Sequence, residues 1–243
     1  MNDEFEGKCT VVTGGSRGMG AEVARQLQAR GCKVAVLARS ADHDVGDLNI
    51  VCDVADEASQ RAAFRQIADT FGRLDYAFIN AGVSTFASLL DMDMQEWDRV
   101  TGINLRGALI SLRETGRLMK QAGHGGSIVT CCSLSTFKPE KYIAPYNASK
   151  AALANLTQTA AREFGEFNIR VNGVAPGLTK TDIIAGTESI PGYVAAVEKR
   201  TPLQHRLGTS ADIADAVLKL LAMQWVTGQI LPVDGGLSLQ TPT

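Results

Sequence analysis

Three side chains that lie near one another in the sequence could carry proton transfer. Tyr146 and Lys150 are four residues apart in PYNASKAAL, a segment with a helical pattern, so both side chains share one helix face. An ammonium group beside a phenol favours its deprotonated form, which makes the pair a candidate acid and base. Ser133 precedes Tyr146 by 13 residues, at the end of the predicted strand SIVTC, and its hydroxyl could bind a carbonyl oxygen. Tyr-x-x-x-Lys alone is common on amphipathic helices, so the pair depends on the elements around it.

A glycine cluster near the start of the chain could hold a phosphate group. The predicted strand Cys9–Thr13 runs into TGGSRGMG, which opens a helical pattern. Gly14 permits a tight turn, Gly18 lets the backbone approach a pyrophosphate, and Gly20 allows close helix packing, while N–H groups at the helix start face the anion. The spacing differs from the standard Gly-x-Gly-x-x-Gly, and glycines also serve ordinary strand-to-helix turns, so a purely structural role stays open.

The end of the second predicted strand indicates which dinucleotide would bind. A site selective for NAD usually has a carboxylate there to hold the ribose 2′-hydroxyl, whereas this chain has Ala38, Arg39 and Ser40. Arg39 could pair with a 2′-phosphate, and Arg17 in the glycine turn adds a second positive charge. We therefore predict that NADP(H) is favoured over NAD(H), the alternative being that both arginines are solvated surface charges.

These residues must be positioned by alternating strands and helices. Short β-branched runs alternate with longer helical patterns along the whole chain, which predicts an α/β fold: one Rossmann-type domain over residues 1–243, with a doubly wound, seven-stranded parallel sheet and helices on both faces. The predicted strands are Cys9–Thr13, Lys33–Ala38, Leu48–Cys52, Tyr76–Asn80, Ser127–Cys131, Arg170–Ala175 and Gln229–Val233. The predicted helices are Gly20–Ala29, Ala58–Phe71, Gln95–Lys120, Ala144–Phe164 and Ser210–Met223. The connection between the second and third strands is too short for the full helix expected there, and the segment LLAMQWVTGQ before the last strand is short of several residues.

Composition excludes several classes of partner. The 24 basic and 26 acidic residues give a net charge of −2, so nucleic acid and anionic membrane are not expected as partners. No apolar run reaches the ~18 residues of a membrane span, and no apolar leader is visible, so a cytoplasmic protein is expected. The five cysteines and three histidines lack the spacing of a metal site; we expect buried, reduced thiols and no metal.

Taken together, the motifs resemble those of the classical short-chain dehydrogenase/reductase family across essentially the whole chain. Besides the glycine turn and the Ser133, Tyr146 and Lys150 set, the chain contains CDV, INAG, INLRG and APG in the family order. The resemblance implies a catalytic tetrad completed by Asn104. With the turn chemistry above, it assigns to the cofactor Gly14, Ser16, Arg17, Gly18, Met19, Gly20, Arg39, Ser40, Asp53, Val54, Asn80, Ala81, Gly82, Tyr146, Lys150, Pro176, Gly177, Thr179 and Thr181.

The same resemblance implies a reaction. Tyr146 would act as general acid and base while hydride moves between nicotinamide and a ketone or secondary alcohol, with Ser133 polarising the carbonyl and Lys150 binding the nicotinamide ribose. A 3-oxoacyl thioester, on acyl carrier protein or CoA, is the alternative substrate, and a non-catalytic dinucleotide-binding regulator is a remote alternative. The family also implies a homo-oligomer, a tetramer or a dimer, packed through the helices that hold Asn104 and Tyr146.

Two regions would then govern substrate choice. Residues 181–202 have the composition of a mobile lid, and Lys138, Glu140 and Lys141 would flank the substrate entrance. Lys138 or Lys141 could hold an anionic substrate end, or all three charges could simply be solvated.

Overall fold

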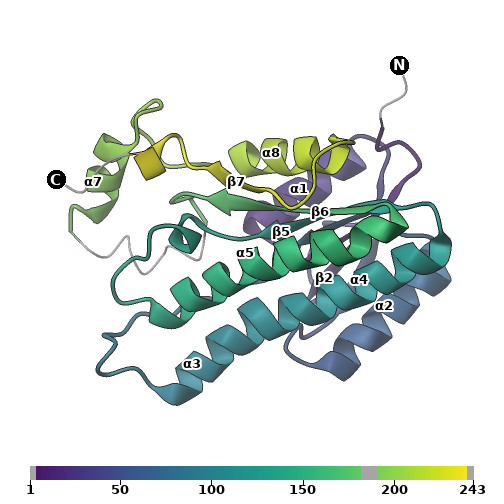
Figure 1. Cartoon of the computed structure of the whole chain (residues 1–243), viewed down its shortest axis with the longest axis horizontal. Coiled ribbons are helices and arrows are strands. Elements are labelled where there is room, and N and C mark those ends of the chain that lie inside the picture. Colours follow the sequence, from purple (N-terminus) through teal and green to yellow (C-terminus); the bar gives the residue numbers. More distant parts are fainter. Residues whose placement is uncertain (1–3, 182–190, 240–243) are drawn as a thin grey trace.

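The computed structural model describes residues 4–181 and 191–239, and a seven-stranded parallel sheet lies at its centre (Figure 1). The strand order is β3-β2-β1-β4-β5-β6-β7. The chain moves outward from β1 in one direction and from β4 in the other, so the sheet is doubly wound and the predicted fold class is confirmed. The strands are β1 (Cys9–Thr13), β2 (Lys33–Ala38), β3 (Leu48–Val51), β4 (Tyr76–Ile79), β5 (Gly126–Cys131), β6 (Ile169–Pro176) and β7 (Ile230–Val233).

Helices cover both faces of the sheet. On one face α1 (Gly18–Gln28) and α8 (Ser210–Ala222) lie side by side and enclose an apolar core. On the other face α2 (Glu57–Phe71), α4 (Ala108–Ala122) and α5 (Ala144–Phe164) enclose a second core. Because both faces are covered, the strands can be continuous apolar runs, and every residue of β1 and β4 is buried.

The predicted helix Gln95–Lys120 exists but is not uniform. It comprises α3 (Met94–Thr101), a π-helical segment (Gly102–Gly107) and α4 in direct succession. A π segment carries an extra residue in the turn and often marks a functional site. Asn104 lies in this segment, so the irregularity falls on a predicted site residue.

The other predicted elements match the structure either in full, as β1, β2 and α5 do, or to within two residues at each end. Residues 39–47, all of which the structure describes, form no helix, as predicted for the connection from β2 to β3. Part of the predicted lid lies outside the described residues, and its mobility stays a prediction; within the described part, α7 (Tyr193–Arg200) is helical. Among the described residues no helix combines the length and the apolar character needed to cross a membrane.

Candidate active site

The glycine turn after β1 is packed too closely to admit side chains at Gly14 and Gly20. A Cβ atom on Gly14 would lie 2.9 Å from Ala81 Cα, and one on Gly20 would lie 2.3 Å from the Gly14 carbonyl oxygen. Thr13 Oγ1 accepts hydrogen bonds from the backbone N–H groups of Asn80 (2.9 Å) and Ala81 (3.1 Å), and Asn80 Nδ2 donates to Gly14 O (3.0 Å). The turn is therefore fixed against the segment that follows β4, where the resemblance also places cofactor contacts.

The start of α1 offers an open place for an anion. The helix has no side-chain cap from Arg17 and no acidic residue in its first turn, so its first N–H groups and positive dipole end are not neutralised by either. Gly18 has φ +55°, and the nearest atom to a Cβ built there is Thr181 Cγ2, at 3.6 Å. Such N–H groups at a helix start could hold the pyrophosphate of a dinucleotide.

The carboxyl end of β2 presents positive charge and no carboxylate. Ala38 is buried, whereas Arg39 and Ser40 are exposed, and Ser40 Oγ accepts from Asp42 N at 3.1 Å. Arg39 makes no hydrogen bond or ion pair with any residue in the described ranges 4–181 and 191–239. Its guanidinium thus keeps all its donors for a ligand.

Asn104 ties the π segment to two neighbouring elements. Its Oδ1 accepts from Val83 N (2.8 Å), and its Nδ2 donates to Val83 O (2.9 Å) and to Ser149 Oγ (3.1 Å). Ser149 Oγ donates in turn to the Tyr146 carbonyl oxygen (2.8 Å). The side chain of Asn104 therefore holds the loop after β4 and the first turns of α5 in one arrangement.

Lys150 and Ser133 complete the predicted tetrad at the end of β5. Lys150 is buried, its Nζ donates to Cys131 O (2.6 Å), and the same atom lies 5.5 Å from the centroid of the Tyr146 ring. Ser133 is also buried, and its Oγ accepts from Ser135 N (3.1 Å), while no described residue accepts its O–H. A Cβ atom on Gly82 would lie 3.4 Å from both Lys150 Nζ and Asn104 Oδ1. The structure thus brings Asn104, Tyr146 and Lys150 together and places Ser133 beside the same strand end.

The predicted adenine and nicotinamide segments lie at other strand ends. Asp53 and Val54 follow β3, and Asp53 Oδ1 accepts from Ala55 N (2.9 Å). Pro176 ends β6, and Thr179 forms a parallel bridge with Gly208. All predicted segments therefore follow the carboxyl ends of parallel strands, which share one edge of the sheet.

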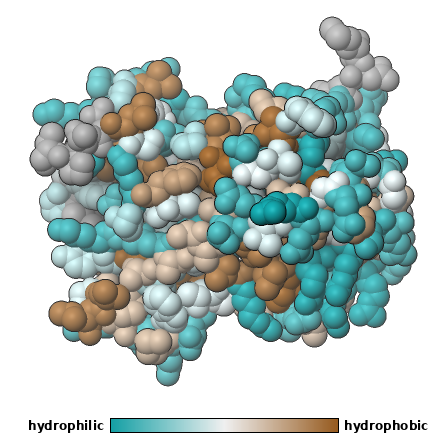
Figure 2. Space-filling model, viewed as in Figure 1, coloured by the Kyte–Doolittle hydropathy of each residue, from teal (hydrophilic) through white to brown (hydrophobic). Residues whose placement is uncertain are grey.

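Two aromatic side chains, Phe86 and Tyr142, lie together on loops at this edge of the sheet. We call this region the mouth of the site. The rings of Phe86 and Tyr142 lie 5.1 Å apart between centroids and are 60% and 50% exposed. Ala87 N donates to Tyr142 O (2.8 Å), which joins the loop after β4 to the loop before α5. Figure 2 shows hydrophobic side chains at this end of the molecule, over the loop that precedes α3. Tyr142 has φ +69°, an unfavourable backbone region for a non-glycine residue.

The charged residues flanking the mouth are exposed, as expected for an entrance. Lys138, Glu140 and Lys141 all face solvent, and Asn147 Nδ2 fixes the loop by donating to Glu140 O (2.7 Å). Burial raises the pKa of the nearby Tyr193 hydroxyl on α7, and the Glu140 carboxylate raises it further.

The five cysteines are free thiols, all buried, in agreement with the sequence. Burial raises the pKa of Cys131, and it raises that of Cys132 to about 11. A buried thiol that stays protonated is a poor nucleophile. We therefore assign this pair, although adjacent to Ser133, to packing.

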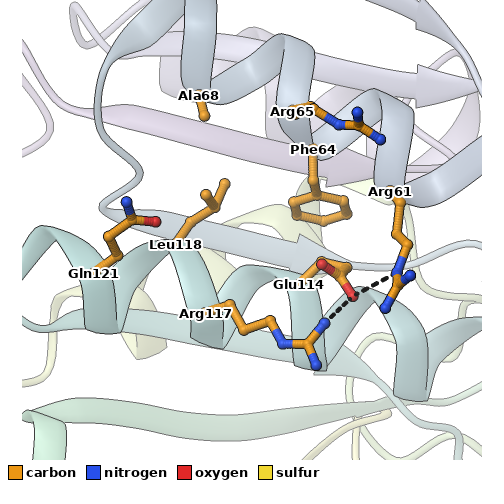
Figure 3. Close-up of a pocket in the computed structure, with 8 residues that line it drawn as sticks. All are labelled: Arg61, Phe64, Arg65, Ala68, Glu114, Arg117, Leu118 and Gln121. Atoms are coloured by element: carbon orange, nitrogen blue, oxygen red, sulfur yellow. Dashed lines mark hydrogen bonds and ion pairs between the residues drawn. The ribbon is translucent and has the colours of Figure 1, made fainter.

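Among the cavities in the described part of the chain, two lie near the surface. One, of about 420 Å³, is a groove between α2 and α4 where Glu114 pairs with Arg61 and Arg117 over the side chains of Phe64 and Leu118 (Figure 3). Its lining residues come from α2 and α4 and include no member of the predicted tetrad, so the groove is separate from the tetrad region. The other, of about 460 Å³, is lined by Gly177 and Leu178 among others, and it borders the segment expected to contact nicotinamide.

Sequence reasoning missed the side chain that connects two parts of this site. Gln60 is fully buried and donates to the carbonyl oxygens of Val54 (2.6 Å) and Gly107 (2.9 Å). The signal was present: Gln60 falls on the helix face that also carries Ala63, Phe64 and Ile67, so it is a polar residue in an apolar stripe.

Comparison with known proteins identifies the family. Residues 14–238 match the family model described as Enoyl-(Acyl carrier protein) reductase. The chain is 37% identical over 250 residues to a cis-4-hydroxycyclohexanecarboxylate dehydrogenase from Sinomonas cyclohexanicum, a match covering 97% of this chain and 98% of the relative. It is 31% identical over 254 residues to an NADP-dependent (R)-specific alcohol dehydrogenase from Lentilactobacillus kefiri, covering 99% and 100%. A crystal structure of a short-chain type dehydrogenase/reductase from Mycobacterium marinum superimposes with a TM-score of 0.91 at 31% identity, covering 97% of each chain. The chain therefore belongs to the short-chain dehydrogenase/reductase family of nicotinamide-dependent oxidoreductases.

Proposed function

We propose that the protein is an NADP(H)-dependent oxidoreductase acting on a ketone or secondary alcohol, with Tyr146 as general acid and base. The nicotinamide supplies or accepts the hydride when bound. In the reductive direction the Tyr146 hydroxyl gives its proton to the carbonyl oxygen, and the Ser133 hydroxyl donates a hydrogen bond to the same oxygen as its negative charge develops.

The observation that carries this proposal is the state of Lys150. Its ammonium is buried, bound to the Cys131 carbonyl and within 5.5 Å of the Tyr146 ring centroid. A buried ammonium is costly unless its charge is used or compensated. Here the charge lies beside the phenol that would exchange the proton, and it lies where Gly82, which has no side chain, leaves room for a ribose hydroxyl to approach.

The preference for NADP(H) is supported by charge at the end of β2. Arg39 is exposed with no partner among the described residues, and Arg17 is exposed in the glycine turn. A guanidinium binds phosphate through two parallel hydrogen bonds, so Arg39 would bind the 2′-phosphate of NADP(H) more strongly than the 2′-hydroxyl of NAD(H). The Lentilactobacillus relative is named as NADP-dependent, which agrees with this choice.

For the substrate we propose a small cyclic or aromatic ketone, with an anionic group held by Lys138 or Lys141. The Phe86 and Tyr142 rings, tilted by 46° to each other, offer an apolar wall at the mouth, and the lysines border it. The Sinomonas relative is named for a cyclohexane ring that bears a carboxylate, a molecule with both features.

A 3-oxoacyl thioester remains the second candidate. The matched family model is described by an acyl carrier protein substrate. Against it, the segment before β6 reads REFGEFN, in which Glu163 and Glu166 offset Arg162, whereas a surface that meets an acidic carrier needs positive charge.

One assay tests these proposals together. NADPH and NADH oxidation would be followed with 4-oxocyclohexanecarboxylate, with cyclohexanone and with acetoacetyl-CoA. We expect NADPH to support faster turnover than NADH, and the cyclic carboxylate to have the highest kcat/KM. Faster turnover of acetoacetyl-CoA would favour the thioester function, and absence of turnover with bound NADPH would favour a regulator.

We further propose a homo-oligomer, a tetramer or a dimer, packed through α4 and α5. Figure 2 shows brown and tan side chains across the helical face that α3, α4 and α5 form in Figure 1, and the exposed Leu109 lies on α4. Light scattering on the purified protein would give the mass; a monomer at micromolar concentration would contradict the proposal.

A further inference from the structure

The buried side chain of Gln60 connects the segment after β3 with the end of the π segment and the start of α4, where its partners lie 47 and 51 residues further along the chain. Its Nε2 donates to Val54 O (2.6 Å) and Gly107 O (2.9 Å), and its Oε1 accepts from Ser111 Oγ (2.7 Å). Both N–H groups of the amide and its carbonyl oxygen are therefore bonded inside the core. A buried amide is tolerated only when it is satisfied in this way, and removing it exposes its partners to the same penalty.

The two carbonyl groups bound by Gln60 belong to opposite ends of the predicted site. Val54 follows β3 in the segment assigned to adenine, and Gly107 ends the π segment that contains Asn104. The backbones are in close contact, since a Cβ atom on Gly107 would lie 2.8 Å from Val54 O. Arg106 adds an exposed link, donating from Nη1 to Ala55 O (2.7 Å).

The π segment needs such bonds to keep its extra residue. A π turn disturbs the regular helical ladder, and its carbonyl groups must be satisfied from elsewhere. Gly107 O accepts from Gln60 Nε2, and Ser111 Oγ, 3.0 Å away, shares its single proton between this oxygen and Gln60 Oε1. Asn104 is bound to Val83 at the other side of the segment. If the segment relaxed by one residue, Asn104 would rotate by ~100° about the helix axis and leave Val83.

We propose that Gln60 is a positioning residue, which fixes the adenine-binding segment and the Asn104 segment relative to each other. The proposal rests on the proposed function, because it assumes that these segments serve one dinucleotide. It implies that a change at Asn104 is felt by the adenine end of the site, and that this coupling passes through Gln60.

The test measures binding of adenosine 2′,5′-bisphosphate, which carries the adenine and the 2′-phosphate but no nicotinamide. Calorimetry would compare wild type, Gln60→Met, Asn104→Ala and the double variant; methionine matches the length of glutamine and has no donor. We expect Kd to rise about tenfold for Gln60→Met and about threefold for Asn104→Ala, with the double variant no weaker than Gln60→Met, because coupled residues do not add. Additive effects of about thirtyfold would overturn the proposal.

Two further measurements separate positioning from mere stability. Thr115→Val is the matched control, because Thr115 is equally buried on α4 and its Oγ1 has no partner among the described residues; we expect its Kd to equal that of wild type. For Gln60→Met, kcat should also fall about tenfold well below the melting temperature. A lowered melting temperature with unchanged Kd and kcat would show a purely structural role. The binding arm needs no turnover, so an inactive wild type would contradict the proposed function without deciding this inference.

Discussion

The nucleotide end and the substrate mouth of the site are built in different ways. At the nucleotide end, backbone groups and buried side chains do the positioning: the Gly14 turn is packed against Ala81, and Asn104 is bonded to Val83 on both of its polar atoms. At the mouth, exposed side chains such as Phe86 and Tyr142 stand on loops joined by one backbone hydrogen bond. The first region can hold one constant ligand precisely, whereas the second can change its side chains without disturbing the sheet.

The largest expected effect contrasts two tyrosines only four residues apart. Tyr146→Phe removes the proposed proton donor and leaves the ring, so kcat should fall by ~10²-fold or more while adenosine 2′,5′-bisphosphate still binds. Tyr142→Phe removes the same group from the mouth and serves as the matched control; we expect its kcat to change less than about threefold. Initial rates at saturating NADPH measure both. Comparable losses in the two variants would contradict the assignment of Tyr146.

The next effect concerns cofactor choice at the end of β2. Ala38→Asp with Arg39→Ala introduces a carboxylate that accepts from the ribose hydroxyl and repels a 2′-phosphate, and it removes the phosphate donor. In the wild type, charge-assisted contacts from Arg39 and Arg17 to the 2′-phosphate, of about 1.5 to 3 kcal/mol each, correspond to a preference of ~100-fold or more for NADPH over NADH. The double variant should therefore reverse the kcat/KM ratio of NADPH to NADH. A wild type that already prefers NADH would overturn the assignment of Arg39.

Loss of Lys150 should affect both catalysis and cofactor binding. Because one ammonium is proposed to bind the ribose and lies next to the Tyr146 ring, Lys150→Ala should lower kcat and weaken NADPH binding together. Ser133→Ala should lower kcat by roughly one to three decades and leave NADPH affinity unchanged. Unchanged NADPH affinity in Lys150→Ala would contradict its role at the ribose.

The sheet and the nucleotide end could be predicted because short stretches of the sequence show the residue types that they require. Strands buried on both faces are continuous apolar runs, and the close approach of Gly14 to Ala81 requires a residue without a side chain. All seven strands were therefore predicted to within two residues at either end. The position of Ser133, at the end of β5, also follows from strand periodicity alone.

The features that were missed depend on contacts across the fold. In the π segment within the predicted helix Gln95–Lys120, Asn104 is bonded to Val83 and Gly107 to Gln60, partners 21 and 47 residues away along the chain. The Phe86–Tyr142 pair likewise joins two loops, so no spacing within either loop indicates it. Helical periodicity reports which residues share a face and says nothing of which carbonyl groups need an outside donor.

A smaller effect tests whether charge at the mouth selects the substrate. If Lys138 or Lys141 binds an anionic substrate end, the corresponding alanine variant should raise KM for 4-oxocyclohexanecarboxylate about tenfold, since one charge-assisted hydrogen bond is worth about 1.5 kcal/mol or more. The neutral analogue 4-methylcyclohexanone is the control, and its KM should stay the same. Equal KM changes for the two substrates would show that both lysines are solvated charges of the loop.

The smallest expected effect compares two residues with left-handed backbone. Gly14 (φ +64°) has no space for a Cβ atom, so Gly14→Ala combines backbone strain with a clash and should destabilise the protein by about 2 kcal/mol or more. Tyr142 (φ +69°) carries a side chain that is half exposed. Tyr142→Gly removes about 1 kcal/mol of strain, loses a ring contact of about 0.5 to 1.5 kcal/mol, and adds freedom to the unfolded chain. These contributions nearly cancel, so urea unfolding should show a loss below ~1 kcal/mol, while KM for a cyclic ketone rises because half of the apolar wall is gone. A loss above ~3 kcal/mol would mean that the mouth, like the nucleotide end, is a rigid part of the fold.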